Sequence, residues 1–313
     1  MPVVTVTGVS GKSGVAFLKR LHLSPPNGYK FRFIFRNKVA AESLLHLLGN
    51  IPHEIVYADF NNDNDLEKLF TSDCSEPTDT LLHIAGIHFS RKIVTSALEH
   101  GVTRLILVHT TGIYSKYKKA SEGYIDTECV IRKMIKDRSA DGNTIYLSIL
   151  RPTMIYGDLQ DGNMSIFIKM VHKLRLFPLI GSGDHSIQPV WCNDLGNAYY
   201  DILVNPEITN NKDYILSGDA PLQLRQMFMI IAEHLHVNNT FISVPFWIAY
   251  SGAWIIYVLS LAKIDLREKV QRMVENRAFS HDEATKDFGY SPTPFEIGIS
   301  EEISMYLESN NNL

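Results

Sequence analysis

The first half of the chain alternates short apolar runs with segments whose apolar residues recur at helical spacing. The apolar runs, rich in β-branched residues, predict buried strands at 3–7, 31–35, 54–58, 80–85, 104–109 and 145–150. The segments between them predict helices at 15–23, 40–48, 65–70, 91–100 and 124–136. This alternation is typical of a parallel sheet covered by helices on both faces, and right-handed crossovers make it a doubly wound α/β fold.

The second half loses this alternation after Pro152. Its patterns predict helices at 166–174, 195–204, 222–234, 245–262, 266–276 and 281–288, with short strand-like runs at 189–192 and 214–216. We therefore expect two domains. The first consists of residues 1–160, joined by 189–216. A smaller, mostly helical substrate domain, or cap, consists of 161–188 and 217–313.

A glycine-rich loop joins the first predicted strand to the first predicted helix, with the spacing T-G-x-x-G-x-x-G at 7–14. In this motif Gly8 permits the tight turn, Gly11 lets the backbone approach a pyrophosphate, and Gly14 lets the helix pack closely on the strand. The free N–H groups of the helix N-terminus would bind the phosphates. The loop therefore predicts that residues 1–160 form a dinucleotide-binding domain.

The end of the second predicted strand indicates which dinucleotide binds. NAD-binding proteins usually place an acidic residue here, which accepts a hydrogen bond from the ribose 2′-hydroxyl. This chain has Arg36 and Lys38 instead, and a guanidinium suits a 2′-phosphate. Lys12 and Ser10 of the glycine loop could assist. These residues favour NADP over NAD.

Several short blocks, in the same order along the chain, resemble the extended and atypical short-chain dehydrogenase/reductase superfamily. The similarity is closest to its NAD-dependent epimerase/dehydratase and NmrA-like groups. It implies a Rossmann fold in which Asp59 contacts the adenine amine, Ala85 borders the cofactor, and Pro152, Thr153 and Met154 line the nicotinamide. The blocks that carry the resemblance lie at 7–14, 57–60, 82–86, 108–114, 150–157, 189–194 and 288–292.

The resemblance also implies a catalytic Ser/Thr, a tyrosine and a lysine, the last two spaced Y-x-x-x-K. Thr110 falls at the Ser/Thr position. Glu128 resembles the glutamate four residues after the family's lysine, which puts Tyr124 at the lysine position and Ala120 at the tyrosine position. A Y-x-x-x-K match that begins at Tyr114 belongs to another block. Either Tyr124 or Tyr114 has taken over the acid role, or the usual turnover is lost.

These residues are consistent with two functions. The first is an NADP-dependent oxidoreductase, epimerase or dehydratase that acts on a small or apolar carbonyl or alcohol, or on a sugar-derived substrate. A nucleotide sugar is less favoured, because residues 186–188 lack the arginine that sugar-nucleotide enzymes of the family carry there. The alternative is an NADP(H)-binding regulatory or assembly protein with reduced catalysis.

The composition and the start of the chain bear on three expectations: nucleic-acid binding, metal binding and the cellular compartment. The net charge of −4 offers no basic excess for nucleic acid. The cysteines, Cys74, Cys129 and Cys192, form no metal-ligand pattern, so we expect no metal site. The chain opens directly into a strand without an export signal, and a cytoplasmic protein is expected. The sequence is also compatible with a homodimer.

Residues 245–262 contain no charged side chain. The preferred interpretation is a buried cap helix that lines the substrate pocket. The alternative is a peripheral membrane contact, in which an apolar helix dips into a bilayer or covers a lipid-like substrate, because Trp and Tyr suit membrane interfaces.

Overall fold

The computed structural model describes residues 1–71 and 76–311, which form two units. Unit 1 comprises Met1–Pro152, Cys192–Leu216 and His281–Ser291. Unit 2 comprises Thr153–Trp191, Ser217–Ser280 and Pro292–Leu313. The division differs from the expected domains in three places: the first segment of unit 1 ends at Pro152 rather than at 160, its second segment begins at Cys192 rather than at 189, and it includes 281–291.

Residues 281–291 belong to unit 1 because of contacts with its last strand. The ring of Phe288 packs edge-on against Tyr214, with 5.1 Å between the centroids. The hydroxyl of Tyr214 donates a hydrogen bond of 2.7 Å to Asp287, and Lys212 forms an ion pair with the same carboxylate at 2.5 Å. These partners lie about 75 residues apart in the sequence, so local patterns do not reveal them.

Unit 1 contains a parallel sheet with the strand order β11-β6-β5-β4-β1-β2-β3, and this confirms the predicted doubly wound fold. After β3 the chain crosses to the other side of β1, so the order reverses between β1 and β4. Ligands of such sheets bind at this switch point, outside the carboxyl ends of the strands. The strands are β1 (Val3–Thr7), β2 (Lys30–Phe35), β3 (His53–Tyr57), β4 (Thr78–His83), β5 (Arg104–Val108), β6 (Tyr146–Pro152) and β11 (Asp213–Leu216).

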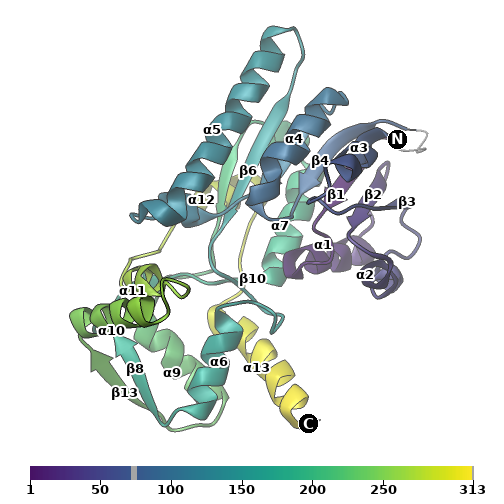
Figure 1. The fold of residues 1–313 in the computed structure, drawn as a ribbon. Coiled ribbons are helices and arrows are strands. Elements are labelled where there is room, and N and C mark those ends of the chain that lie inside the picture. Colours follow the sequence, from purple (N-terminus) through teal and green to yellow (C-terminus); the bar gives the residue numbers. More distant parts are fainter. Residues whose placement is uncertain (72–75, 312–313) are drawn as a thin grey trace. The chain divides into compact units, whose positions relative to one another are not determined.

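Helices cover both faces of this sheet (Figure 1). On one face α1 and α7 approach closely, because a Cβ on Gly196 would lie only 2.4 Å from the carbonyl carbon of Ala16. On the other face α3, α4 and α5 pack against the strands in one apolar cluster. The helices of unit 1 are α1 (Lys12–Leu23), α2 (Lys38–Glu42), α3 (Asp63–Thr71), α4 (Ser90–Glu99), α5 (Lys118–Ala140), α7 (Cys192–Val204), α8 (Pro206–Thr209) and α12 (Asp282–Phe288), with 3-10 helices η1 (Leu45–Leu47), η2 (Ile87–Phe89) and η3 (Thr111–Tyr114).

Unit 2 has its own apolar core, built mainly from α6, α9 and α13. The sequence analysis predicts no helix at α13, although Phe295, Ile299 and Ile303 recur at helical spacing and are buried. The helices are α6 (Met164–Lys173), α9 (Leu224–His234), α10 (Phe246–Leu259), α11 (Arg267–Arg272) and α13 (Phe295–Asn311). Two-stranded pairings join β7 (Ile155–Tyr156) to β10 (Val190–Trp191), β9 (Ser186–Ile187) to β12 (Leu222–Gln223), and β8 (Leu176–Ile180) to β13 (Thr240–Val244).

The apolar segment 245–262 forms α10 and the turn after it, but the preferred interpretation of a buried helix is wrong. Within α10 only Ala253 is buried, whereas Trp247, Ile255 and Leu259 are exposed. The pattern misled because a helix without a polar face does not indicate which side meets the core. In the part of the chain that the structure describes, no helix has both the length and the hydropathy to cross a membrane.

Candidate functional site

The glycine loop lies at the carboxyl end of β1, and two of its glycines are required by close backbone packing. Gly8 has a φ of +77°, and a Cβ on it would lie 2.4 Å from the backbone nitrogen of Ala85. A Cβ on Gly14 would lie 2.2 Å from the carbonyl oxygen of Gly8. These contacts bring the first turn of α1 against the loop and set the loop beside the segment that follows β4.

Gly11 differs from the other two glycines. Its φ of −80° is open to any residue, and a Cβ there would meet only the Gly8 carbonyl oxygen, at 3.3 Å. Its backbone nitrogen donates to that same oxygen at 3.0 Å. Gly11 precedes α1 as the N-cap and supplies no side chain to cap the helix. Packing within the protein therefore requires glycine less strictly at this position than at Gly8 and Gly14. The absence of a side chain leaves room for a phosphate before the N-terminus of α1.

The basic residues proposed for the 2′-phosphate lie on the surface near the loop. Arg36 follows β2 directly and is exposed, as is Ser10, while Lys12 is half-buried. Lys38 forms an exposed ion pair with Glu42 at 3.7 Å, across one turn of α2. Such a pair contributes about 0.5 kcal/mol at most, so it leaves Lys38 able to exchange its partner for a phosphate.

Asp59 follows β3 and closes a local turn. Its Oδ1 accepts hydrogen bonds from the backbone nitrogen of Asn61 at 3.0 Å and from the Asn61 side chain at 2.9 Å. Its own backbone nitrogen donates to Asp65 at 3.1 Å. These bonds fix the position of a half-buried carboxylate at the carboxyl edge of the sheet.

The candidate catalytic residues Thr110 and Tyr124 meet at Gly112. Thr110 lies beyond the end of β5, and its hydroxyl accepts a hydrogen bond from the backbone nitrogen of Gly112 at 3.0 Å. A Cβ on Gly112 would lie 3.0 Å from Cε2 of the Tyr124 ring. The structure therefore brings together two residues that come from the end of β5 and from α5. Tyr114 is half-exposed, and its ring centroid lies 5.8 Å from Cζ of Arg151.

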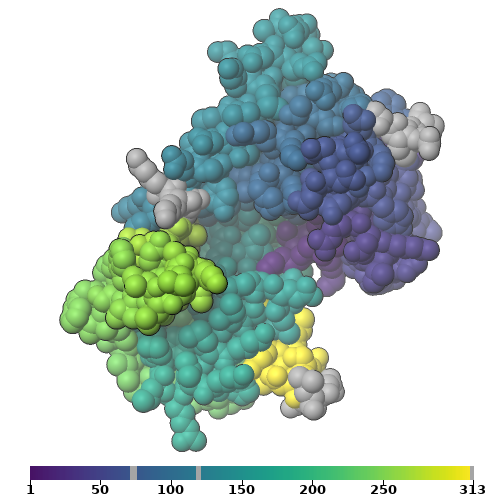
Figure 2. All heavy atoms as spheres, viewed as in Figure 1, coloured from purple at the N-terminus to yellow at the C-terminus, as the bar shows by residue number. Residues whose placement is uncertain are grey.

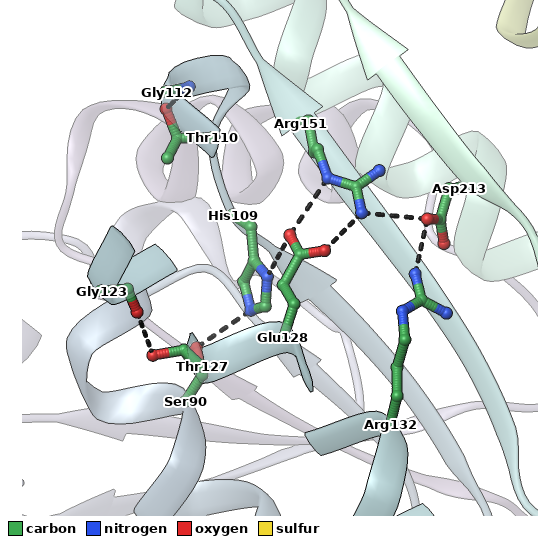
Figure 3. A network of polar contacts seen from close by, with 10 residues as sticks. All are labelled: Ser90, His109, Thr110, Gly112, Gly123, Thr127, Glu128, Arg132, Arg151 and Asp213. Carbon is green, nitrogen blue, oxygen red and sulfur yellow. Dashed lines mark hydrogen bonds and ion pairs between the residues drawn. The ribbon is translucent and has the colours of Figure 1, made fainter. Parts of the chain in front are cut away.

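Beneath Thr110 lies a buried polar network (Figure 3). Nδ1 of His109 hydrogen-bonds to Oε1 of Glu128 at 3.0 Å, and its Nε2 lies 3.2 Å from Oγ of Ser90. Arg151 donates to both oxygens of Glu128, at 3.0 and 2.5 Å. The network ties α4, the end of β5 and β6 to α5, and this fixes the register in which Tyr124 lies one turn before Glu128.

The network continues to the surface through Asp213. Arg151 donates to Oδ2 of Asp213 at 2.9 Å, and Arg132 donates to the same oxygen at 2.5 Å. Burial alone would raise the pKa of Glu128, but hydrogen bonds and charge from His109 and Arg151 outweigh it and hold the pKa at about 2. Sequence reasoning used Glu128 only as a register mark and missed Arg151 and Asp213. The available signal was Arg151, a charged residue directly after the apolar run at 145–150.

His83 ends β4 beside the glycine loop and is fully buried. Its Nδ1 hydrogen-bonds to the hydroxyl of Thr7 at 2.7 Å, whereas its Nε2 has no partner in the described part of the chain. Burial, and then the nearby charges of His109 and His88, lower the pKa of His83 to about 3. The imidazole is therefore neutral, as expected for a histidine of the core.

The three residues expected to line the nicotinamide divide between the units. Pro152 ends unit 1, and its carbonyl accepts a hydrogen bond from Thr111 at 3.2 Å. Thr153 and Met154 begin unit 2, where the Thr153 hydroxyl donates to the carbonyl of Gln188 at 2.5 Å and Met154 packs against the core. Among the described residues, no three His, Cys, Asp or Glu side chains gather as a metal site. Cys74 lies outside the described residues.

Comparison with known proteins identifies similar folds. No family model and no curated protein matches the sequence. Solved structures do match over nearly the whole chain. A UDP-glucose 4-epimerase from Thermotoga maritima is 15% identical, with a TM-score of 0.68, and the match covers 98% of this chain and 99% of that one. An NADPH-dependent quinone oxidoreductase from Escherichia coli is 17% identical, with a TM-score of 0.70 and coverage of 97% and 99%.

A dTDP-glucose 4,6-dehydratase from Streptomyces venezuelae, solved with NAD, is 15% identical, with a TM-score of 0.70 and coverage of 99% and 98%. At such identities the likeness concerns the fold. It extends over both units, because each match covers almost the entire chain. The chain therefore shares its fold with solved structures of an epimerase, a dehydratase and a quinone oxidoreductase.

Proposed function

We propose that unit 1 binds a nicotinamide dinucleotide at its glycine loop, NADP(H) in preference to NAD(H). We further propose that the chain is an oxidoreductase, epimerase or dehydratase of a small or apolar carbonyl or alcohol, or of a sugar-derived substrate. The observation that carries the proposal is the contrast within the loop. Packing demands Gly8 and Gly14, whereas the bare backbone at Gly11 suits the approach of a ligand to the start of α1.

The residues of unit 1 divide the binding among them. The loop backbone and the first N–H groups of α1 would hold the pyrophosphate, and Arg36 and Lys38 would hold a 2′-phosphate with help from Ser10 and Lys12. The turn closed by Asp59 would meet the adenine, and Ala85 borders the loop. The similar structures carry NADPH in one case and NAD in another, so they support the cofactor class. The preference for NADP(H) rests on Arg36 and Lys38.

Chemistry would take place near Thr110 and Tyr124. When bound, the nicotinamide supplies a hydride acceptor or donor. The Thr110 hydroxyl, oriented by its bond from Gly112, would polarise a substrate oxygen, and the Tyr124 phenol would hydrogen-bond to the ribose or exchange a proton. Because Ala120 occupies the position of the family's tyrosine, and Tyr124 that of its lysine, we expect slow turnover on ordinary dehydrogenase substrates.

The same departure favours a second candidate, an NADP(H)-binding regulatory or assembly protein. A screen of carbonyl substrates that follows NADPH absorbance separates the two. Turnover that Tyr124→Phe reduces at least tenfold, while Tyr114→Phe does not, supports an enzyme with Tyr124 as its acid. Full activity in both variants would remove the tyrosines from the chemistry. Absence of turnover across the screen, with tight cofactor binding, would favour the regulatory role.

Calorimetric titration tests the binding itself. We expect NADPH to bind at least tenfold more tightly than NADH, and Arg36→Asp to reverse that preference, since the exchange replaces a phosphate partner with a hydroxyl acceptor. Gly11→Val should abolish binding while the circular dichroism spectrum is kept. Gly162→Val is the matched control, because a Cβ added to that exposed glycine would meet no other atom within 4 Å. Equal affinity for both cofactors, or binding by Gly11→Val, would contradict the proposal.

A further inference from the structure

The surface of α10 and the turn that follows it is apolar and exposed. We define the α10 surface by its exposed apolar side chains: Phe246, Trp247, Ile248, Trp254, Ile255, Ile256, Val258, Leu259, Leu261 and Ile264. Residues 240–262 contain no charged side chain. Single exposed apolar residues are ordinary on proteins, but a continuous group along one helix marks a site of interaction. In Figure 2 the segment of α10 and α11, drawn in light green, forms part of the visible surface of unit 2.

The turn after α10 holds apolar side chains outward in an unusual backbone conformation. Leu261 and Ala262 have φ values of +51° and +63°, a left-handed conformation that non-glycine residues rarely adopt. Ser260 secures the turn, because its hydroxyl accepts a hydrogen bond from the backbone nitrogen of Ile264 at 3.0 Å. As a result Leu261 is 82% exposed. Backbone strain of this kind concentrates at functional sites.

Aromatic rings and a fixed cation border the apolar side chains. The guanidinium of Arg267 lies over the rings of Trp254 and Tyr257, at 4.8 and 3.9 Å from their centroids. Asp265 orients it through two hydrogen bonds of 2.9 and 2.7 Å. Tryptophan and tyrosine beside a cation are the side chains that favour the boundary between the hydrocarbon and the headgroups of a bilayer.

The charge at this border distinguishes between partners. Residues 263–272 contain four basic and two acidic side chains, a net charge of +2, in a chain whose overall charge is −4. Lys263 and Lys269 are exposed. Cations at this position complement anionic headgroups. A second copy of the chain would offer another cationic border rather than an acidic one, so its charge complements this surface less well than anionic headgroups do.

The dimensions exclude a spanning arrangement. The 14 residues of α10 extend over about 21 Å, whereas a spanning helix needs about 20 apolar residues. The side of α10 that carries the buried Ala253 packs against the rest of the protein. The opposite side is exposed and can enter an apolar medium. We propose that α10 and the turn at 260–264 dock in the interfacial layer of a lipid bilayer whose surface carries anionic headgroups, with Lys263 and Lys269 against those headgroups.

Flotation of the full chain with vesicles tests this docking. The vesicles are phosphatidylcholine alone, or phosphatidylcholine with about 30% phosphatidylserine. We expect the chain to float with the anionic vesicles, and Leu259→Glu to lower the bound fraction at least fivefold. Leu23→Glu, on α1 of unit 1, is the matched control, because both leucines are 78% exposed. This variant should float like the unchanged protein. Lys263→Glu combined with Lys269→Glu should weaken binding to anionic vesicles more than binding to neutral ones.

Three results would overturn the proposal. The first is a chain that floats with neither vesicle. The second is a Leu259→Glu variant that floats as well as the unchanged protein. The third is a dimer, seen by light scattering without lipid, that Leu259→Glu dissociates while no vesicle binding occurs. That outcome would assign the α10 surface to a second copy of the chain. Cofactor titration of Leu259→Glu should match the unchanged protein, which shows that the variant is folded and separates this test from that of the cofactor site.

Discussion

Glu128 in unit 1 and Glu302 in unit 2 are both buried, but their surroundings favour opposite charge states. Hydrogen bonds and charge from His109 and Arg151 outweigh the effect of burial and hold the pKa of Glu128 at about 2. Burial raises the pKa of Glu302 to about 8, and the adjacent carboxylate of Asp161 adds to the effect through a hydrogen bond and its negative charge. Burial alone therefore does not decide ionisation. The presence of a buried cation does.

The two environments serve different structural purposes. Around Glu128, matched charges join α5 to the strand ends that carry Thr110. Around Glu302, Asp161 is already engaged at the N-terminus of α6, where it accepts a hydrogen bond from the backbone nitrogen of Asn163 at 2.9 Å. Glu302 accepts one from the backbone nitrogen of Leu159 at 3.2 Å. Among the described residues, no basic side chain forms an ion pair with Asp161 or Glu302. Burial and the nearby carboxylate therefore favour the neutral form of Glu302.

The two glutamates should differ most in stability when each is replaced by glutamine, which cannot ionise. Glu128→Gln leaves Arg151 buried with only Asp213 as a charged partner, so we expect it to lower the free energy of unfolding by about 4 kcal/mol. Glu302→Gln replaces a neutral acid with a neutral amide and should change stability by less than about 1 kcal/mol at pH 5. Urea denaturation followed by circular dichroism measures both. Equal losses in the two variants would contradict the assigned charge states.

Both glutamates should make the stability of the protein depend on pH, and the two contributions should change in opposite directions as the pH rises. The contribution of Glu128, whose pKa is lowered, is complete above its unfolded value near 4.5 and is lost as the pH falls toward 2. The contribution of Glu302, whose pKa is raised, is complete below 4.5 and is lost as the pH rises through 8. Between pH 5 and 9 the stability contributed by Glu302 should fall by on the order of 4 kcal/mol.

Thermal unfolding across this range checks the sign. The unchanged protein should become less stable from pH 5 to pH 9, and Glu302→Gln should flatten that slope because the amide does not titrate. If the slope is the same in both proteins, Glu302 is not the group that titrates. Asp161→Asn is no substitute as a control, because it also alters the hydrogen bonds at the start of α6.

The smallest effect should come from the exposed arginine of the same network in unit 1. Arg151 and Arg132 both donate to Asp213, but the Arg151 side chain is 6% exposed and that of Arg132 is 47% exposed. Arg132→Met should therefore lower the free energy of unfolding by less than about 1 kcal/mol, because water can replace the exposed partner. The same urea titration measures it. A loss as large as that of Glu128→Gln would mean that the outer pair carries the network.

Local patterns in the sequence determined the doubly wound sheet and the position of the glycine loop. The reason is that strand burial, turn glycines and helical spacing are set by residues close together in the chain. The resemblance of Glu128 to the family's glutamate placed Tyr124 one turn earlier, and the structure brings Tyr124 to Gly112 beside Thr110. The roles proposed for these residues in binding and catalysis remain predictions.

Only the tertiary structure decided which distant side chains meet. The partners of Arg151 lie 23 and 62 residues away, so no local spacing relates them. The exposure of α10 was equally undetermined, because a helix that is apolar on every side satisfies a core and an interface alike. The charge state of Glu302 depended on Asp161, 141 residues earlier in the chain. Contacts formed through folding, rather than composition or periodicity, set these three features.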